Sequence, residues 1–150
     1  MPKLTVNESA GDFTDVIKLT YVDLQNIGNG GQKVIATIPA GGGVDLAVVH
    51  ESVAFAGTSS LVIDVGTTAG DPDEFIDALD VDAMSGPVAN TGDAFVQADG
   101  TTTIAGGSLP VKLVAADTDV ILEVTDAAIA SATAGELVVG LRIIDLGRFA

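Results

Sequence analysis

Alternating apolar and polar residues dominate residues 34–65. Three alternating stretches follow one another there, separated by two glycine-rich connections. A period of two places every second side chain on one face, which is typical of β-strands with one buried face. The pattern therefore predicts a meander of three consecutive strands, at about 32–38, 44–54 and 58–65.

The same period recurs towards both ends of the chain, between turn-forming residues. Further strands are predicted at 16–22, 94–97, 101–105, 110–115, 120–125 and 136–146. Residues 72–80 differ, because Pro72 suits a first helical position and Phe75, Ile76 and Leu79 follow at helical spacing. About eight strands and one short helix at 72–80 indicate an all-β fold, an antiparallel, jelly-roll-like β-sandwich.

Length and composition fit one domain with an aliphatic core. The 150 residues are 47% apolar but only 4% aromatic, and cysteine is absent, so that disulfides and thiolate metal sites are excluded. Residues 1–15 show no sustained period, and we expect an extended N-terminal arm before a single sandwich domain at 16–150. The chain shows neither the apolar core of a signal peptide nor a membrane-spanning run, and we expect assembly in the cytoplasm.

The charge is strongly acidic, with 21 carboxylates against 6 basic residues and a net charge of −15. The basic residues are spread singly, whereas phosphate contacts need clustered lysine and arginine, so nucleic acid and anionic membrane are not expected as partners. Solubility explains the acidity most simply. A basic partner surface or a saline habitat remain alternatives.

The last predicted strand, 136–146, is apolar on both faces. Its two faces carry, respectively, Leu137, Val139, Leu141 and Ile143, and Val138, Ile144 and Leu146. A strand buried on both sides needs a second cover. A neighbouring subunit could supply it, or the strand could be central in its sheet beneath a loop of its own chain.

Only one histidine could anchor a hydrolytic triad. His50 lies in mid-strand on the face of Leu46 and Val48, which predicts a packed or interfacial histidine, and the chain has no G-x-S-x-G motif. We therefore predict no catalytic residue and no enzymatic activity.

Two further patterns resemble ligand sites but have simpler explanations. The densest carboxylate cluster comprises Asp71, Asp73, Glu74, Asp77, Asp80 and Asp82. It does not match an EF-hand loop, so an acidic solvated helix face is predicted rather than a metal site, and calcium binding remains an alternative. The glycine-rich GNGGQK and PAGGGV match neither a P-loop nor a dinucleotide fingerprint, which predicts turns and no cofactor site.

Three segments together resemble a known family. They are IPAGG at 38–42, AFAGTSSLVIDVGTTAGDPDEFI at 54–76 and ELVVGLRIID at 136–145. In their order they resemble small β-sandwich virion proteins of tailed bacteriophages, the capsid decoration or cement proteins. The resemblance extends over about residues 16–146.

This resemblance implies a non-enzymatic protein on the capsid exterior, bound to the major capsid protein, commonly as a homotrimer. Such a protein stabilises the shell by binding its assembled state, and the arm at 1–15 is a candidate for contact with a capsid neighbour. Two alternatives remain: a tail or head-fibre component of the virion, and a carbohydrate-binding β-sandwich module.

Overall fold

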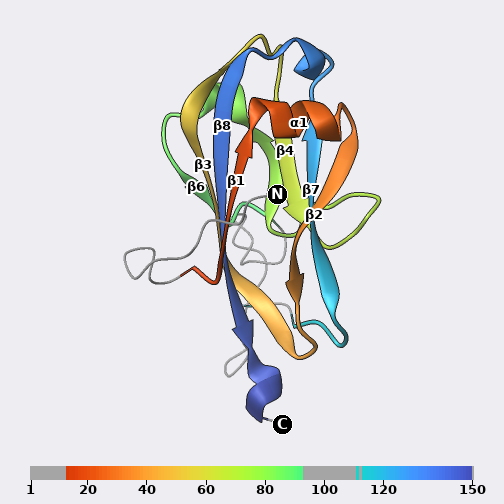
Figure 1. Ribbon diagram of the computed structural model, residues 1–150. Coiled ribbons are helices and arrows are strands. Elements are labelled where there is room, and N and C mark those ends of the chain that lie inside the picture. Colours follow the sequence, from red (N-terminus) through yellow and green to blue (C-terminus); the bar gives the residue numbers. More distant parts are fainter. Residues whose placement is uncertain (1–12, 93–110, 112, 150) are drawn as a thin grey trace, which may run out of the picture.

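Two antiparallel four-stranded sheets pack face to face in the computed structural model, which describes residues 13–92, 111 and 113–149 (Figure 1). The β1 sheet has the strand order β1-β8-β3-β6, and the β2 sheet has the order β2-β7-β4-β5. The strands are β1 (Asp15–Thr20), β2 (Gly31–Ile38), β3 (Gly42–Ala56), β4 (Val62–Gly66), β5 (Ile76–Asp80), β6 (Val88–Ala89), β7 (Thr118–Thr125) and β8 (Ala134–Asp145).

The strand pairs are nested along the chain. The first strand pairs with the eighth, the second with the seventh, the third with the sixth and the fourth with the fifth. The chain thus resembles one long hairpin folded into two sheets, and the predicted all-β antiparallel sandwich is confirmed. The predicted meander is wrong, because β2 and β4 belong to one sheet and β3 to the other.

An aliphatic core fills the space between the sheets, as the composition predicts. Its strand residues with no more than 2% exposure include Ile17, Leu19, Val49, Ile63, Val65, Val120, Leu122, Val124, Leu137, Val139 and Leu141. Along β1 and β7 these residues alternate with half-buried or exposed ones, and in β8 the outward Gly140 is buried as well. Burial of each large side chain contributes roughly 1.5–3 kcal/mol, so this layer is the main source of stability.

The α-helix lies at a place that the sequence analysis assigned partly to a strand. β1 ends at Thr20, and α1 (Tyr21–Ile27) follows, so that the predicted strand at 16–22 is two residues too long. The Thr20 hydroxyl accepts a hydrogen bond from the Asp23 backbone, and the Asp23 carboxylate accepts one from the Thr20 backbone. This capping box satisfies two amide groups at the start of the helix.

The predicted helix at 72–80 is wrong. Residues 71–75 form a loop, and β5 then pairs antiparallel with β4, with Ile76 opposite Val65 and Leu79 opposite Ile63. Between these pairs, Asp64 of β4 faces two residues of β5, Asp77 and Ala78, which is a β-bulge, and Ala78 in it has a φ of 47°. The bulge turns both Ile76 and Leu79 into the core, and their spacing of three imitates a helical face.

Three other predictions fall in the region after β6. The predicted strands at 94–97 and 101–105 lie outside the described residues, as do residues 1–12 of the predicted arm. Residues 113–115 belong to no strand, so this part of the prediction at 110–115 is wrong. Instead, Val114 makes two backbone hydrogen bonds with the turn before β3, one with Gly41 and one with Gly42.

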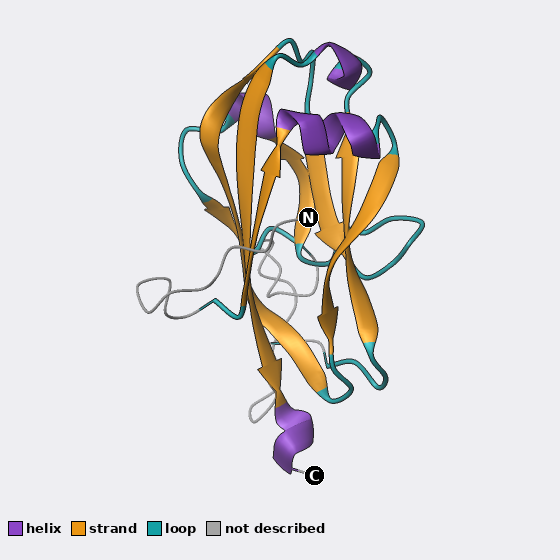
Figure 2. Ribbon diagram, viewed as in Figure 1, coloured by secondary structure: helices purple, strands orange, loops and turns teal. Residues whose placement is uncertain are grey.

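Helices occupy the ends of the sandwich rather than its faces. Figure 2 shows α1 and the 3-10 turns η2 (Val81–Ala83) and η3 (Ile129–Ser131) towards one end, and η4 (Leu146–Phe149) at the other. The outer faces of both sheets are therefore left without a helical layer in the described part of the chain. Among the described residues, no helix has the length and apolar character needed to cross a membrane.

Candidate functional site

His50 lies on the outer face of β3 and is exposed. A β-bulge between Val44 and Leu46 shifts the alternation, so that Ala47 and Val49 point into the core instead of the row of Leu46, Val48 and His50. The prediction of a packed histidine is therefore wrong. An interfacial role for His50 stays a prediction.

A shallow cavity of about 200 Å³ lies beside His50. Its lining includes Glu51, Met84 and Ser85, so an acid, an imidazole and a hydroxyl are neighbours. A hydrolytic triad needs these groups joined by hydrogen bonds. The Glu51 carboxylate instead accepts a hydrogen bond from the Phe55 backbone at 3.2 Å, and no hydrogen bond in the described residues links it to the imidazole.

Carboxylates of the acidic segment 71–82 accept hydrogen bonds that hold loops and strands of the fold in place. Glu74 is 5% exposed and accepts hydrogen bonds from the Thr67 backbone at 2.8 Å, the Thr67 hydroxyl at 3.0 Å and the Thr68 hydroxyl. Burial alone would raise the pKa of Glu74, but these hydrogen bonds outweigh it and lower the pKa below its ordinary value. A Cβ atom on Gly66 would lie 1.9 Å from the Glu74 carboxylate, so glycine is needed there.

Asp82 and Asp80 also bind nearby backbone and side-chain groups. The Asp82 carboxylate accepts hydrogen bonds from the Thr58 hydroxyl and the Leu61 backbone, each at 3.0 Å. The Asp80 carboxylate accepts a hydrogen bond from the Ala83 backbone amide at 3.3 Å and so caps the 3-10 turn η2. Across the described ranges, no group of three or more histidine, cysteine or acidic residues is placed to hold a metal ion.

Asp126 is a buried carboxylate that the sequence analysis did not single out. It is 2% exposed and accepts hydrogen bonds from the Ser59 hydroxyl at 2.6 Å and from the backbones of Ser59, Ser60 and Ala128. Burial would raise its pKa, yet these donors lower it. The only sign of this role in the sequence is a polar run, Thr58–Ser60, just before β4. Its hydroxyls and amides donate to the carboxylates of Asp82 and Asp126.

The glycine-rich connections are turns, as predicted. Gly28 and Gly30 in the first and Gly41 in the second have φ values of 82°, 72° and 81°, a region that favours glycine. The turn at Gly41 is tied to two other segments, because its amide donates to Val114 and its carbonyl accepts from Leu146.

The outer face of the β1 sheet combines apolar side chains with paired charges. Gly140 lies between Val16 and Val48 in the register, and Val138 lies between Lys18 and His50. Lys18 pairs with Glu136 at 2.9 Å, and Arg142 pairs with Asp45 at 2.8 Å. The charges of these two pairs cancel.

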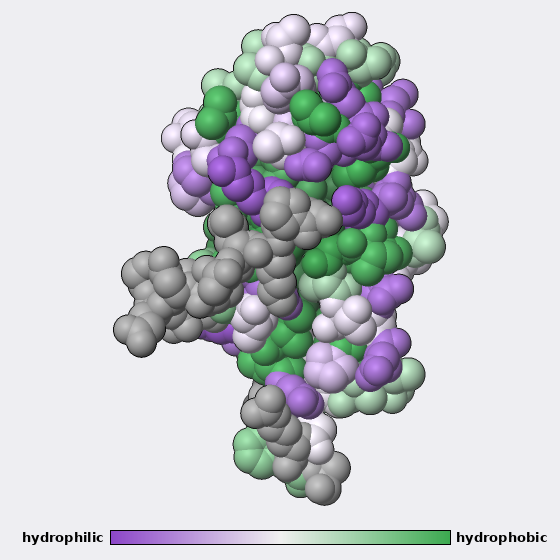
Figure 3. Space-filling view, viewed as in Figure 1, coloured by the Kyte–Doolittle hydropathy of each residue, from purple (hydrophilic) through white to green (hydrophobic). Residues whose placement is uncertain are grey.

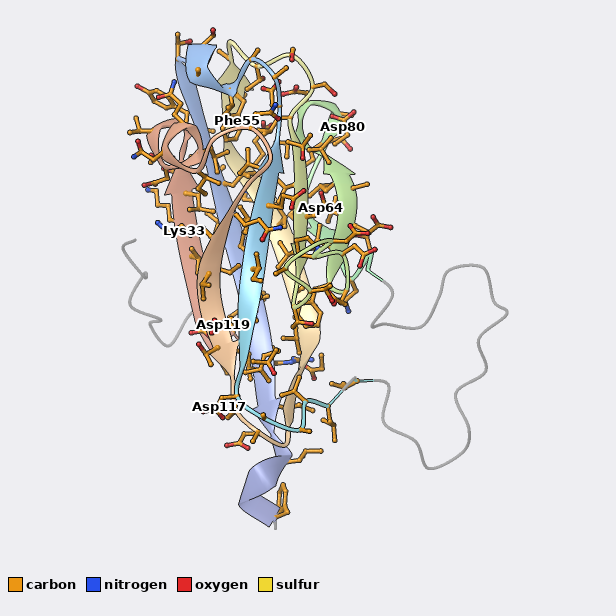
Figure 4. The ribbon with its side chains drawn as sticks, turned by 90° about the vertical axis from the view of Figure 1, so that its right-hand side faces the viewer. Lys33, Phe55, Asp64, Asp80, Asp117 and Asp119 are labelled. Carbon is orange, nitrogen blue, oxygen red and sulfur yellow. The ribbon has the colours of Figure 1, made fainter. Side chains whose placement is uncertain are left out.

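The outer face of the β2 sheet is acidic. Asp64, Asp119 and Glu123 belong to it, and Asp64 and Asp119 can be followed in Figure 4, where Lys33 marks the edge strand β2. Burial raises the pKa of Asp64, and the charges of Asp77 and Glu123 raise it further, while a hydrogen bond from the Ala78 backbone at 2.6 Å opposes both. The carboxylates of Asp77 and Glu123 on this sheet thus repel that of Asp64.

β8 is central in its sheet, between β1 and β3, as the intramolecular alternative predicted, and cover by a neighbouring subunit stays a prediction. Its outward Gly140 is buried beneath Phe13, and outward Val138 and Ile144 are half-buried. Its inward Leu137, Val139 and Leu141 are fully buried. Figure 3, in which the two sheets are seen from their edges as in Figure 1, shows hydrophobic residues along the middle of the visible side, between hydrophilic ones.

Comparison with known proteins gives a likeness of fold. No model of a protein family matches the chain, and no curated protein sequence matches it significantly. A chain in a structure of the capsid of Ralstonia phage GP4 superposes with a TM-score of 0.50 and 16% identity, over 94% of this chain and 89% of that one. A chain in the acid-stable capsid structure of Helicobacter pylori bacteriophage KHP30 gives 0.47 and 16%, over 86% and 87%. At such low identity, the likeness to the GP4 chain shows a shared fold.

Proposed function

We propose that the protein is a non-enzymatic structural component of a phage virion, a decoration protein that binds the outer surface of the capsid and stabilises it. The observation that carries this proposal is the fold shared with a chain in the GP4 capsid over nearly the full length of both. The order of segments 38–42, 54–76 and 136–145, which resembles capsid decoration proteins, supports the same function independently.

The use of the polar residues agrees with a structural role. The buried carboxylates Glu74 and Asp126 fasten loops through backbone and hydroxyl donors, as a scaffold requires. The major capsid protein is the proposed partner, with the protein self-associating as a homotrimer. A protein that binds the assembled shell but not its dissociated subunits stabilises the shell by mass action, by about 2.7 kcal/mol per site at a concentration 100 times Kd.

Capsids of the encoding phage, assembled without this protein, provide the test. Added protein should co-sediment with them at saturating stoichiometry, raise their melting temperature and give density on the outer surface in cryo-electron microscopy. Density on the tail or a head fibre would favour that alternative. Absence of binding to capsids, together with a specific hit in a glycan screen, would contradict the proposal and favour a carbohydrate-binding module.

A further inference from the structure

The two outer faces of the sandwich differ in charge. On the β1 sheet, the paired charges of Lys18 with Glu136 and Arg142 with Asp45 cancel. On the β2 sheet, Asp64 and Glu123 lie close enough that their charges interact, and Asp77 adds a third. A chain of net charge −15 thus keeps one face locally balanced.

The balanced face is also apolar at its centre. The register places Val16, Gly140 and Val48 in one outward row across three strands, and Val138 in the next row between Lys18 and His50. The ring of Phe13 lies over Gly140, so an aromatic side chain joins the valines. Val16, Val48 and Val138 are half-buried and His50 is exposed.

Symmetry indicates which of the two outer faces can meet other copies of this chain. In a two-fold dimer the same face of both copies meets, and in a three-fold ring the faces turned towards the axis approach one another near that axis. Acidic faces brought together in this way repel, which costs several kcal/mol when like charges meet. A face with an apolar centre and internally paired charges avoids this cost and gains from burial of its valines.

We propose that copies of this chain associate through the outer face of the β1 sheet, defined by Val16, Val48, His50, Val138 and Phe13 over Gly140. This inference rests on the proposed function in one respect, since it names the surface of the self-association proposed there. It leaves the acidic face of the β2 sheet turned away from the axis.

The test compares the same substitution on the two outer faces. Val138→Asp places a carboxylate in the proposed interface, and Val34→Asp places one on β2, where Val34 is 51% exposed and faces outward beside Ile121. Sedimentation velocity and light scattering of the full chain at micromolar concentration measure the oligomeric state. The wild type and Val34→Asp should be oligomers, whereas Val138→Asp should dissociate with a Kd raised about 100-fold or more.

His50→Glu is a second interface variant, used in case Val138→Asp fails to fold. His50 is exposed, so the substitution should leave the melting temperature nearly unchanged and still weaken association. A monomeric wild type would overturn the inference, and the face would then be a binding surface for residues 1–12 or for another protein. Oligomers that persist in folded Val138→Asp and His50→Glu, or that dissociate only in Val34→Asp, would overturn it too.

The two proposals fail differently. A monomer that still decorates capsids would remove this interface and the proposed homotrimer, and keep the proposed binding and stabilisation of the capsid. An oligomer that dissociates as described but never binds capsids would keep the interface and remove the function.

Discussion

The ring of Phe13 lies directly against Gly140, in the space left by a residue without a side chain. A Cβ atom on Gly140 would come within 2.8 Å of the ring carbons Cδ1 and Cε1. The neighbouring Thr14 fixes this placement, since its backbone and hydroxyl donate to the Leu141 carbonyl and its hydroxyl accepts from the Ile143 amide. The segment before β1 is thereby attached to β8.

Replacement of Gly140 by valine should displace Phe13. The added side chain cannot share the space with the ring, and we expect a loss of stability of about 1–3 kcal/mol in urea denaturation. In a Phe13→Ala background the same replacement should cost much less, because the obstructing ring is gone. Equal costs in both backgrounds would show that the contact carries no energy.

Asp126 should be among the most sensitive polar positions. Asp126→Ala leaves the amides of Ser59, Ser60 and Ala128 without their acceptor, and we expect a loss of about 3 kcal/mol. Asp119→Ala is the matched control, an exposed carboxylate on the preceding strand, and should change the unfolding free energy by less than about 0.5 kcal/mol. Similar losses in both variants would contradict the assigned role.

Glu74 should make the protein less stable in acid. Its pKa in the folded state is below the ordinary value of 4.5, so its contribution is present above that pH and is lost as the pH falls through the folded-state pKa. Glu74→Gln should therefore be less stable than the wild type at pH 7, by about 1–3 kcal/mol, with a smaller difference at pH 3. Chemical denaturation across this pH range measures both. A constant difference would exclude the ionised carboxylate as the cause.

Asp64 should act in the opposite direction. Its folded-state pKa is raised above the ordinary value of 3.8, so the group favours folding below that pH and this advantage is lost as the pH rises through the folded-state pKa. Asp64→Asn keeps an oxygen for the Ala78 amide and removes the repelling charge. We expect it to stabilise the protein at pH 7 by a few tenths of a kcal/mol, because solvent screens this half-exposed group, and to lose that gain at pH 3.

Strand alternation predicted the fold well where one face of a strand is buried. The strands around 32–38, 44–54, 120–125 and 136–146 are confirmed to within two residues at each end, and with them the all-β sandwich. Their pairing was not predictable in the same way. Which strands become neighbours depends on contacts between distant segments, so three consecutive strands that look like a meander can alternate between two sheets.

Two of the errors occur where a bulge alters the local spacing. The bulge at Ala78 inserts one residue into β5, so that this strand has the spacing of a helix. The bulge after Val44 inserts one residue into β3, so that the exposed His50 has the spacing of a packed residue. The short α1 carried a readable signal in Thr20 and Asp23, a capping box with aspartate in place of glutamate. Little in the local sequence marks Asp126 as buried, because apart from Ala128 its donors are Ser59 and Ser60, which lie 67 and 66 positions earlier.

The nested pairing also dictates when the protein can finish folding. Thr14 bonds to Leu141, 127 positions later, and β8 lies between β1 and β3, so the β1 sheet cannot form until β8 has left the ribosome. Contacts this distant make folding slow, because a long loop must close before they form. A nascent chain that ends before β8 would expose the unpaired edges of β1 and β3, and only chains that include β8 could acquire the native topology.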